Sequence, residues 1–364
     1  METQAILQDL VFVLLYGGVT MMNVVAALYL LLRRGNAIAP DVSSPIRLRR
    51  WAAAFMLVAV LSHVSWFFYL RYPSLEGYTI VCGLDILLLI PTIAGILLSM
   101  LQDRRRPAWP LAAALVPAFI LIVLSIIRRD DSLYLPITVY VISLYALFML
   151  YMFFAVRRYG RWLKDNYADL EHKEIWQSLL ILAVFLLFFV MYSSTAEENK
   201  VLLYLLQIDN LLIVGLLVWR VETLQVMVEN TSAEEESAEE LQKSSAPPVI
   251  PTNIGPRLKK HCEEGRLYLH HDITLAQLAQ IIGTNRYYLS QHFAQQGITY
   301  NAYINGLRIR HFIDLYHEAV ANQRDFTAQQ LAFESGFHSY STFSTTFKQN
   351  MGMTVTQWMR SNAK

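Results

Sequence analysis

Long apolar runs separated by short connections constrain this chain of 364 residues more than any other feature. Seven runs are long enough to cross the roughly 30 Å hydrocarbon core of a bilayer at about 1.5 Å per helical residue. Apolar residues make up 55% of the chain and charged residues only 16%, as expected of a membrane protein. We therefore expect an all-α fold that begins with a seven-helix transmembrane bundle, with spans at Leu10–Leu32, Trp51–Leu70, Tyr78–Leu101, Ala108–Ile127, Leu133–Val156, Ile175–Ser193 and Val201–Trp219.

The basic residues lie mostly in alternate connections between these runs. The first, third and fifth connections carry 13 Lys and Arg residues, whereas the others carry four and the segment before the first run carries none. The positive-inside rule then places the N-terminus outside and the C-terminus in the cytoplasm. Because no basic residue precedes the first run, we expect it to span the membrane rather than to be cleaved as a signal peptide.

The composition changes after the last run. Val221, Leu224, Val228 and Thr231 follow a 3-4-3 spacing, which predicts that the seventh helix continues into the cytoplasm. A Glu-rich run and a Ser-Ser-Ala-Pro-Pro stretch then indicate a solvated linker. Self-association through the helical extension, and competition of the acidic run with DNA for a basic tail, are alternatives to a simple spacer. The expected domains are residues 1–219, a tether and linker at 220–254, and a C-terminal domain at 255–364.

The C-terminal domain repeats itself at an offset of 53 to 55 residues. A small residue where two helices cross, a glycine at the corner and a polar N-cap for the next helix are typical of a helix-turn-helix unit. The two copies of this pattern predict two such units. The first copy comprises Leu278-Ala279, Gly283, Asn285, Leu289, Phe293, Gly297-Ile298-Thr299 and Tyr303, and the second comprises Leu331-Ala332, Gly336, Ser339, Phe343, Phe347, Gly352-Met353-Thr354 and Trp358.

Several residues of the second copy point to a known family. Gly336-Phe337, Ser341, Phe343, Phe347-Lys348 and Gly352-Met353-Thr354 resemble the DNA-binding domain of AraC/XylS-type bacterial transcription regulators, over about residues 255–361. The resemblance implies a helix that joins the two units, so that both recognition helices enter successive major grooves on one face of DNA. The matching segment, Tyr300 to Val320, would be about 30 Å long, which is close to one turn of B-DNA.

The resemblance also implies which side chains contact DNA. The residues expected to read bases are Tyr287, Ser290, Gln291, Tyr340, Ser341, Ser344 and Thr345, and those expected to contact phosphates are Arg286, Arg308, Arg310 and Lys348. Gln can pair with adenine in the major groove, whereas Ser and Thr hydroxyls are less selective. Gln291 and Thr345 stand where many relatives have Arg, which suggests modest affinity, and Val355 stands where the family usually has Pro.

These features favour a membrane-bound one-component transcription regulator of the bacterial inner membrane. Its implied partners are double-stranded promoter DNA, the lipid bilayer and RNA polymerase, and a homodimer is compatible with the sequence. We find no protease or phosphate-loop motif, so we expect no enzyme activity and no cofactor. His270-His271 and Cys262 lack a paired metal-ligand spacing, so no metal site is expected. The alternatives are a transporter, enzyme or receptor-like protein with an accessory DNA-binding module, and spans that serve only as an anchor.

A sensing role for the spans depends on their few polar residues. His63, Asp85, Asp209 and Asn210 are candidates for a signal pocket that binds an unknown small molecule or senses a membrane signal. Ionisable residues inside a bilayer usually face a partner or a water-filled cavity. The alternative is that these side chains only hold helices together through hydrogen bonds.

Overall fold

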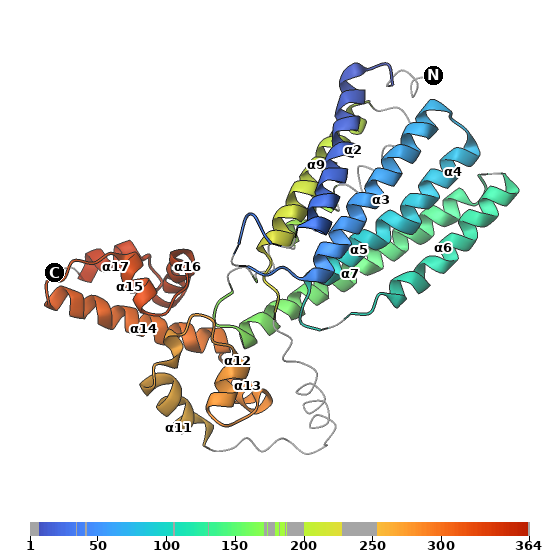
Figure 1. Cartoon of the computed structure of the whole chain (residues 1–364). Helices are drawn as coiled ribbons and strands as arrows, with labels where there is room; N and C mark the ends of the chain where they lie inside the picture. The colour runs from blue at the N-terminus through green and yellow to red at the C-terminus, as the bar shows by residue number, and fades with distance from the viewer. Residues whose placement is uncertain are drawn as a thin grey trace, which may run out of the picture. The chain divides into compact units, whose positions relative to one another are not determined.

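The computed structural model describes residues 7–33, 35–40, 42–104, 106–129, 131–170, 173, 179–181, 183–185, 187, 200–227 and 253–362. These residues form helices and their connections, as the predicted all-α fold requires (Figure 1). The chain divides into two compact parts. The spanning part comprises Met1–Tyr159 and Glu174–Met227, and the helix-turn-helix part comprises Gly160–Lys173 and Val228–Lys364.

Six helical segments among the described residues of the chain are long and apolar enough to cross a membrane. They correspond to six of the seven predicted spans, and the remaining one, Ile175–Ser193, lies largely outside the described residues. The segments are α2 (Leu10–Leu32), α3 (Ile46–Arg71), the run of α4 (Leu75–Leu84), η1 (Asp85–Leu89) and α5 (Ile90–Met100), then α6 (Trp109–Arg128), α7 (Tyr134–Asn166) and α9 (Lys200–Thr223).

The third of these segments changes its winding at Asp85. The five residues of η1 form a π-helical turn between α4 and α5, and Pro91 follows at the start of α5. A π-helical turn inserts an extra residue into the helical repeat, and such turns occur often at functional sites. The polar residue Asp85 thus lies at the only π-helical turn that the structure describes in the spanning part.

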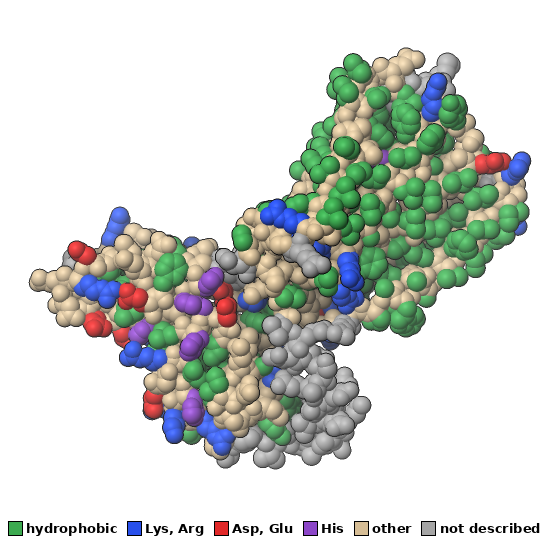
Figure 2. Space-filling view, in the orientation of Figure 1, with side chains coloured by type: hydrophobic (Ala, Val, Ile, Leu, Met, Phe, Trp, Pro, Cys, Tyr) green, Lys and Arg blue, Asp and Glu red, His purple; other side chains and the backbone are tan. Residues whose placement is uncertain are grey.

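The spanning part is apolar on its outside. Large apolar side chains such as Leu14, Leu32 and Ile127 are mostly exposed, and Figure 2 shows hydrophobic side chains over the visible face of these helices. Its interior is also mostly apolar, but it contains buried polar residues as well, among them Asn23, Asp209, Asn210, Arg220 and Glu222. An apolar outer surface with polar side chains kept inside suits helices whose outer surface meets lipid rather than water.

Helix α9 ends at Thr223, so the predicted helical continuation is wrong for residues 224–227. The buried carboxylate of Glu222 accepts two backbone N–H groups from the connection between α2 and α3. The Gln102 side chain accepts a hydrogen bond from the Met227 N–H at 3.0 Å. Because of these tertiary contacts, residues 224–227 do not form a further helical turn. The other positions of the predicted continuation, Val228 and Thr231, lie outside the described residues.

The helix-turn-helix part contains two short helix pairs joined by a long helix. The first repeat comprises α12 (Leu275–Ile281) and α13 (Arg286–Gln295), and the second repeat comprises α15 (Ala328–Glu334) and α16 (Tyr340–Met351). Helix α14 (Tyr300–Ala321) joins them. The remaining described elements are α11 (Ile254–Leu258), η2 (Lys259–Glu264), η3 (Leu267–Leu269) and α17 (Val355–Asn362).

Candidate nucleic-acid interface

The two repeats begin with the same capping arrangement. The Thr274 hydroxyl accepts a hydrogen bond from the Gln277 N–H while the Gln277 side chain accepts one from the Thr274 N–H, and Thr327 and Gln330 do the same in the second repeat. This capping box satisfies N–H groups that the first helical turn leaves unpaired. These Thr-x-x-Gln segments mark the start of each helix pair, a sequence signal that the predictions above had not included.

The turns of both repeats match the sequence prediction. Gly283 and Gly336 adopt φ values of +71° and +95°, a conformation that favours glycine. Asn285 and Ser339 then cap α13 and α16 through their side chains, accepting the N–H groups of Tyr288 and Thr342. Each second helix therefore starts at a defined point and orientation relative to the first helix of its repeat.

Each second helix has one buried and one accessible face. Leu289 and Phe293 are buried on α13, and Phe343 and Phe347 are buried on α16. The residues expected to read bases lie off these buried positions. Ser341 and Thr345 are exposed, and the others are half-buried, namely Tyr287, Ser290, Gln291, Tyr340 and Ser344. Their positions are compatible with a protein surface that enters a major groove.

Arg308 is not available to DNA, so its predicted phosphate contact is wrong. Its side chain is only 1% exposed. Its guanidinium donates hydrogen bonds to the carbonyl oxygens of Tyr268 at 2.7 Å and His270 at 2.8 Å, and it lies over the Phe337 ring. A surface phosphate therefore cannot reach it. Of the other residues predicted to contact phosphates, Arg310 and Lys348 are exposed and Arg286 is half-buried.

Arg308 also contributes to a joint between the repeats. It reaches from α14 to the segment before α12 and to Phe337 at the turn of the second repeat. At the same turn, the Gly336 carbonyl lies 3.0 Å from Nδ1 of His271. A Cβ atom at Gly336 would lie 2.8 Å from the Leu269 Cα atom. This close packing fixes the two repeats relative to each other.

A further segment of the helix-turn-helix part packs on the first repeat. It is Gly160–Lys173, which includes the last residues of α7. Ala168 is 1% exposed and lies in the same apolar cluster as Leu278, Leu289 and Phe293. The Asn166 side-chain oxygen accepts a hydrogen bond from Arg286 Nε at 2.8 Å. Nothing in the sequence pattern had indicated this contact.

Three of the four polar residues predicted to form a signal pocket make polar contacts, each with a different partner. Nδ1 of His63 lies 3.2 Å from the Thr20 hydroxyl, and Asp85 accepts a hydrogen bond from the Trp66 indole at 2.8 Å. Asn210 accepts one from the Asn23 amide at 2.8 Å. Asp209 is 3% exposed, and neither of its carboxyl oxygens has a hydrogen-bond partner among the described residues.

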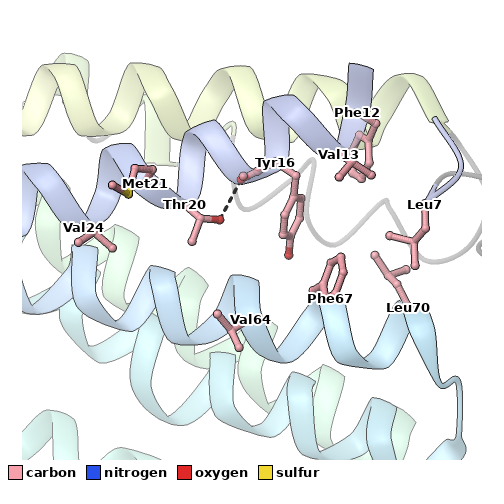
Figure 3. A pocket seen from close by; sticks show the side chains of 11 residues that line it. Leu7, Phe12, Val13, Tyr16, Thr20, Met21, Val24, Val64, Phe67 and Leu70 are labelled. Atoms are coloured by element: carbon pink, nitrogen blue, oxygen red, sulfur yellow. Dashed lines mark hydrogen bonds between the residues drawn. The ribbon is translucent and has the colours of Figure 1, made fainter. Parts of the chain in front are cut away.

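A cavity of about 340 Å³ lies between α2 and α3. Figure 3 shows Tyr16 pointing from α2 toward α3, and the Tyr16 hydroxyl donates a hydrogen bond to the His63 carbonyl at 2.6 Å. None of the four predicted pocket residues lines this cavity, although His63 contacts Thr20, which does. The lining residues are almost all apolar, namely Leu7, Phe12, Val13, Tyr16, Gly17, Thr20, Met21, Val24, Val64, Phe67 and Leu70.

Comparisons with known proteins agree with the geometry of the repeats. Residues 278–361 match the helix-turn-helix domain family. An uncharacterized HTH-type transcriptional regulator of Staphylococcus aureus strain MRSA252 is 29% identical over 104 residues, which cover 28% of this chain and 13% of that protein. The TCP pilus virulence regulatory protein of Vibrio cholerae is 31% identical over 84 residues, or 23% of this chain and 29% of that protein. No solved structure matches the chain significantly.

Residues 278–361 of the C-terminal segment thus match a helix-turn-helix domain family, in agreement with the two repeats predicted from the sequence. By their names, these two relatives are a transcriptional regulator and a virulence regulatory protein. The matches span less than a third of each of these two relatives.

Proposed function

We propose that this protein is a membrane-bound one-component transcription regulator, in which the spanning part detects a signal and the helix-turn-helix part binds promoter DNA. The observation that carries this proposal is that the described residues of one chain include both six helical segments of spanning length and a duplicated helix-turn-helix with accessible second helices. The proposed domains are the spans up to residue 219, a linker, and a DNA-binding domain from residue 255.

The proposed DNA interface uses both second helices. Gln291 on α13, and Ser341 and Thr345 on α16, would read base edges, together with Tyr287, Ser290, Tyr340 and Ser344. Arg286, Arg310 and Lys348 would contact phosphates, which position a protein without reading sequence. Helix α14 has 22 residues and is therefore about 33 Å long, a length that suits two major grooves one helical turn apart.

The experiment for DNA binding uses the full-length protein in lipid nanodiscs and a pool of random duplex DNA. Repeated selection should enrich a sequence that the protein protects over two successive major grooves. Binding should weaken steeply as the salt concentration rises, because phosphate contacts release counterions. Enrichment of no sequence at all would refute the proposed regulator.

The proposed orientation has the N-terminus outside and the helix-turn-helix part in the cytoplasm, where DNA and RNA polymerase are present. Its basis is the excess of Lys and Arg in alternate connections. Alkaline phosphatase fused after Lys364 should be inactive, because it needs the periplasm, and a cytoplasmic reporter fused there should be active. The opposite result would place the helix-turn-helix part away from DNA and contradict the proposal.

The proposed sensing role centres on Asp209. The Asp209 carboxyl is buried and has no hydrogen-bond partner in the part of the chain that the structure describes, which is unfavourable in lipid surroundings. A bound signal or a shift of α9 could therefore change its contacts. We expect Asp209→Asn to preserve membrane insertion and DNA binding but to fix reporter transcription at one level, with or without signal. Asp209→Leu should do the same if the carboxylate is the switch. Normal signalling by both variants would show that Asp209 is only a tolerated polar residue and not part of a switch.

A further inference from the structure

The surface of the first repeat is already occupied by another segment of the same chain. We define the docked segment as Gly160–Lys173, which follows the apolar run of α7 directly. Tyr167 forms an antiparallel bridge with Thr274, the residue that caps α12. The docked segment therefore meets the first repeat at the beginning of its first helix.

Two amide side chains of α14 hold the backbone of the docked segment. Asn301 donates hydrogen bonds to the carbonyl oxygens of Tyr167 at 3.2 Å and Ala168 at 2.7 Å. Asn305, which is buried, donates to the Ala168 carbonyl at 3.1 Å. Because Asn301 and Asn305 are four residues apart, they lie on the same face of the helix. Because two side chains donate hydrogen bonds to the segment and Ala168 is buried, this contact is a specific intramolecular interface.

The contact with Arg286 affects the predicted DNA interface directly. The Asn166 amide nitrogen donates to the Trp162 carbonyl one turn earlier in α7 at 2.7 Å, which directs the Asn166 oxygen toward Arg286. Arg286 is the first residue of α13, and it donates through Nε. A guanidinium whose Nε–H is already hydrogen-bonded has one N–H group fewer for a bidentate contact with a phosphate.

We infer that the docked segment and a DNA phosphate compete for the first repeat, so that release of the docked segment permits full DNA binding. The inference rests on the proposed DNA-binding function. In helix-turn-helix proteins the first helix crosses the DNA backbone and the second begins at the groove. The docked segment covers Thr274 and Arg286, at the starts of both helices. The docked segment begins within the last turns of α7. A movement of that helix would therefore be transmitted to the DNA-binding surface without involving the linker.

The second repeat provides the internal control. Thr327 has the same capping role as Thr274, and among the described residues its side chain forms hydrogen bonds only with Gln330 of its own capping box. Lys348 and Ser341 on α16 are exposed. The docked segment thus restrains the first repeat alone, and the second repeat can hold DNA while the first is blocked.

The first test asks whether the contact forms in the full-length protein in nanodiscs. Facing residues of an antiparallel pair have Cβ atoms about 4.5–5.5 Å apart, close to the distance that a disulfide needs. Tyr167→Cys combined with Thr274→Cys should form an intramolecular disulfide under mild oxidation. Tyr167→Cys with Thr327→Cys, which keeps the same native cysteines, should not. Equal yields from both pairs, or none from the first, would overturn the docking.

The second test measures competition with the duplex obtained by selection. Adding this DNA should slow disulfide formation in the Tyr167→Cys, Thr274→Cys protein. Asn166→Asp, which places a carboxylate against Arg286, should weaken DNA binding by roughly tenfold, whereas Asn166→Ala should strengthen it. In an Arg286→Ala background both effects should disappear.

The outcomes separate the two proposals. The inferred competition fails if DNA leaves the rate of disulfide formation unchanged, or if Asn166→Ala weakens DNA binding. Either result would show that the docked segment stabilises the first repeat and does not compete with DNA. Failure to enrich any duplex would refute the proposed regulator, and the disulfide yield would still report whether docking occurs.

Discussion

The two helix-turn-helix repeats share their local rules and differ in what surrounds them. Both have a capping box, a glycine turn and a polar cap on the second helix. The apolar cluster of the first repeat includes Ala168, which is distant in sequence, whereas the cluster of the second is formed by residues 309–358 and is rich in aromatic rings. Local sequence thus specifies the motif, and long-range contacts decide how freely each copy can meet DNA.

The variant with the largest expected effect, Phe347→Ala, tests whether the two repeats are separate folding units. Phe347 is fully buried, and its ring centroid lies 5.6 Å from those of Phe312, Phe343 and Trp358. We expect Phe347→Ala to destabilise the second repeat by about 3–5 kcal/mol. Hydrogen exchange should then rise in α16, and protection of one half of the selected DNA site should be lost.

The matched variant in the first repeat is Phe293→Ala. Phe293 packs against Tyr300 and Tyr303 within its own cluster. We expect Phe293→Ala to remove protection of the opposite half of the DNA site. If either variant abolished both halves together, the joint at Gly336 and Arg308 would be strong enough to make the repeats one folding unit.

The next prediction compares two arginines of α14 that lie two residues apart. Arg308→Met should destabilise the helix-turn-helix part by about 3 kcal/mol, because the carbonyl oxygens of Tyr268 and His270 lose their donors. Arg310 is exposed, so Arg310→Met should leave stability unchanged and reduce the salt slope of DNA binding by about one. Thermal unfolding and binding titrations over a range of salt distinguish the two effects. Equal stability of both variants would contradict the structural role of Arg308.

A smaller difference is expected between the two turn glycines. Both have positive φ, so alanine should strain either turn by about 1 kcal/mol or more. At Gly336 the added Cβ would also lie within 3.0 Å of the Leu269 backbone, whereas at Gly283 its nearest neighbour is the flexible Arg257 side chain at 3.3 Å. We expect Gly336→Ala to lower the melting temperature more than Gly283→Ala. The reverse order would show that the joint between the repeats adapts easily.

The last comparison concerns sequence preference, where the expected effect is confined to single base pairs. Gln291→Ala should cost about 1–3 kcal/mol at one particular base pair if Gln291 makes a bidentate contact. Thr345→Ala in the second repeat should cost less, because one hydroxyl bond contributes only about 0.5–1.5 kcal/mol. Repeating the selection with each variant checks both values. If Gln291→Ala weakened binding without altering the selected sequence, α13 would not read bases through this residue.

Periodicity and length were sufficient to predict much of this fold. The predicted first span, Leu10–Leu32, coincides with α2, because a continuous apolar run bounded by polar residues leaves few alternatives. The glycine turns at Gly283 and Gly336 and the caps at Asn285 and Ser339 were also predicted correctly. These features depend on neighbouring residues, which is why one sequence reveals them.

The features that sequence reasoning missed depend on distant residues. Arg308 was expected on the surface because it is charged. It lies four residues after Ile304 and four residues before Phe312, so it is on the same buried face of α14 as these two residues. That spacing could have revealed its position. The end of α9 at Thr223 could not be foreseen, since it depends on Gln102 and on the connection after α2. The docking of Asn166 on Arg286 joins residues 120 positions apart.

The place of Ala168 in the first cluster has a consequence for modularity. A hybrid that joined residues 253–364 to a foreign membrane anchor would leave a gap where Ala168 packs, and it would deprive Asn301 and Asn305 of their carbonyl acceptors. Exchange of such tails between regulators, by recombination or by engineering, would succeed best if the end of α7 travelled with the tail. The two halves of this protein are therefore expected to be inherited as a matched pair rather than shuffled as independent pieces.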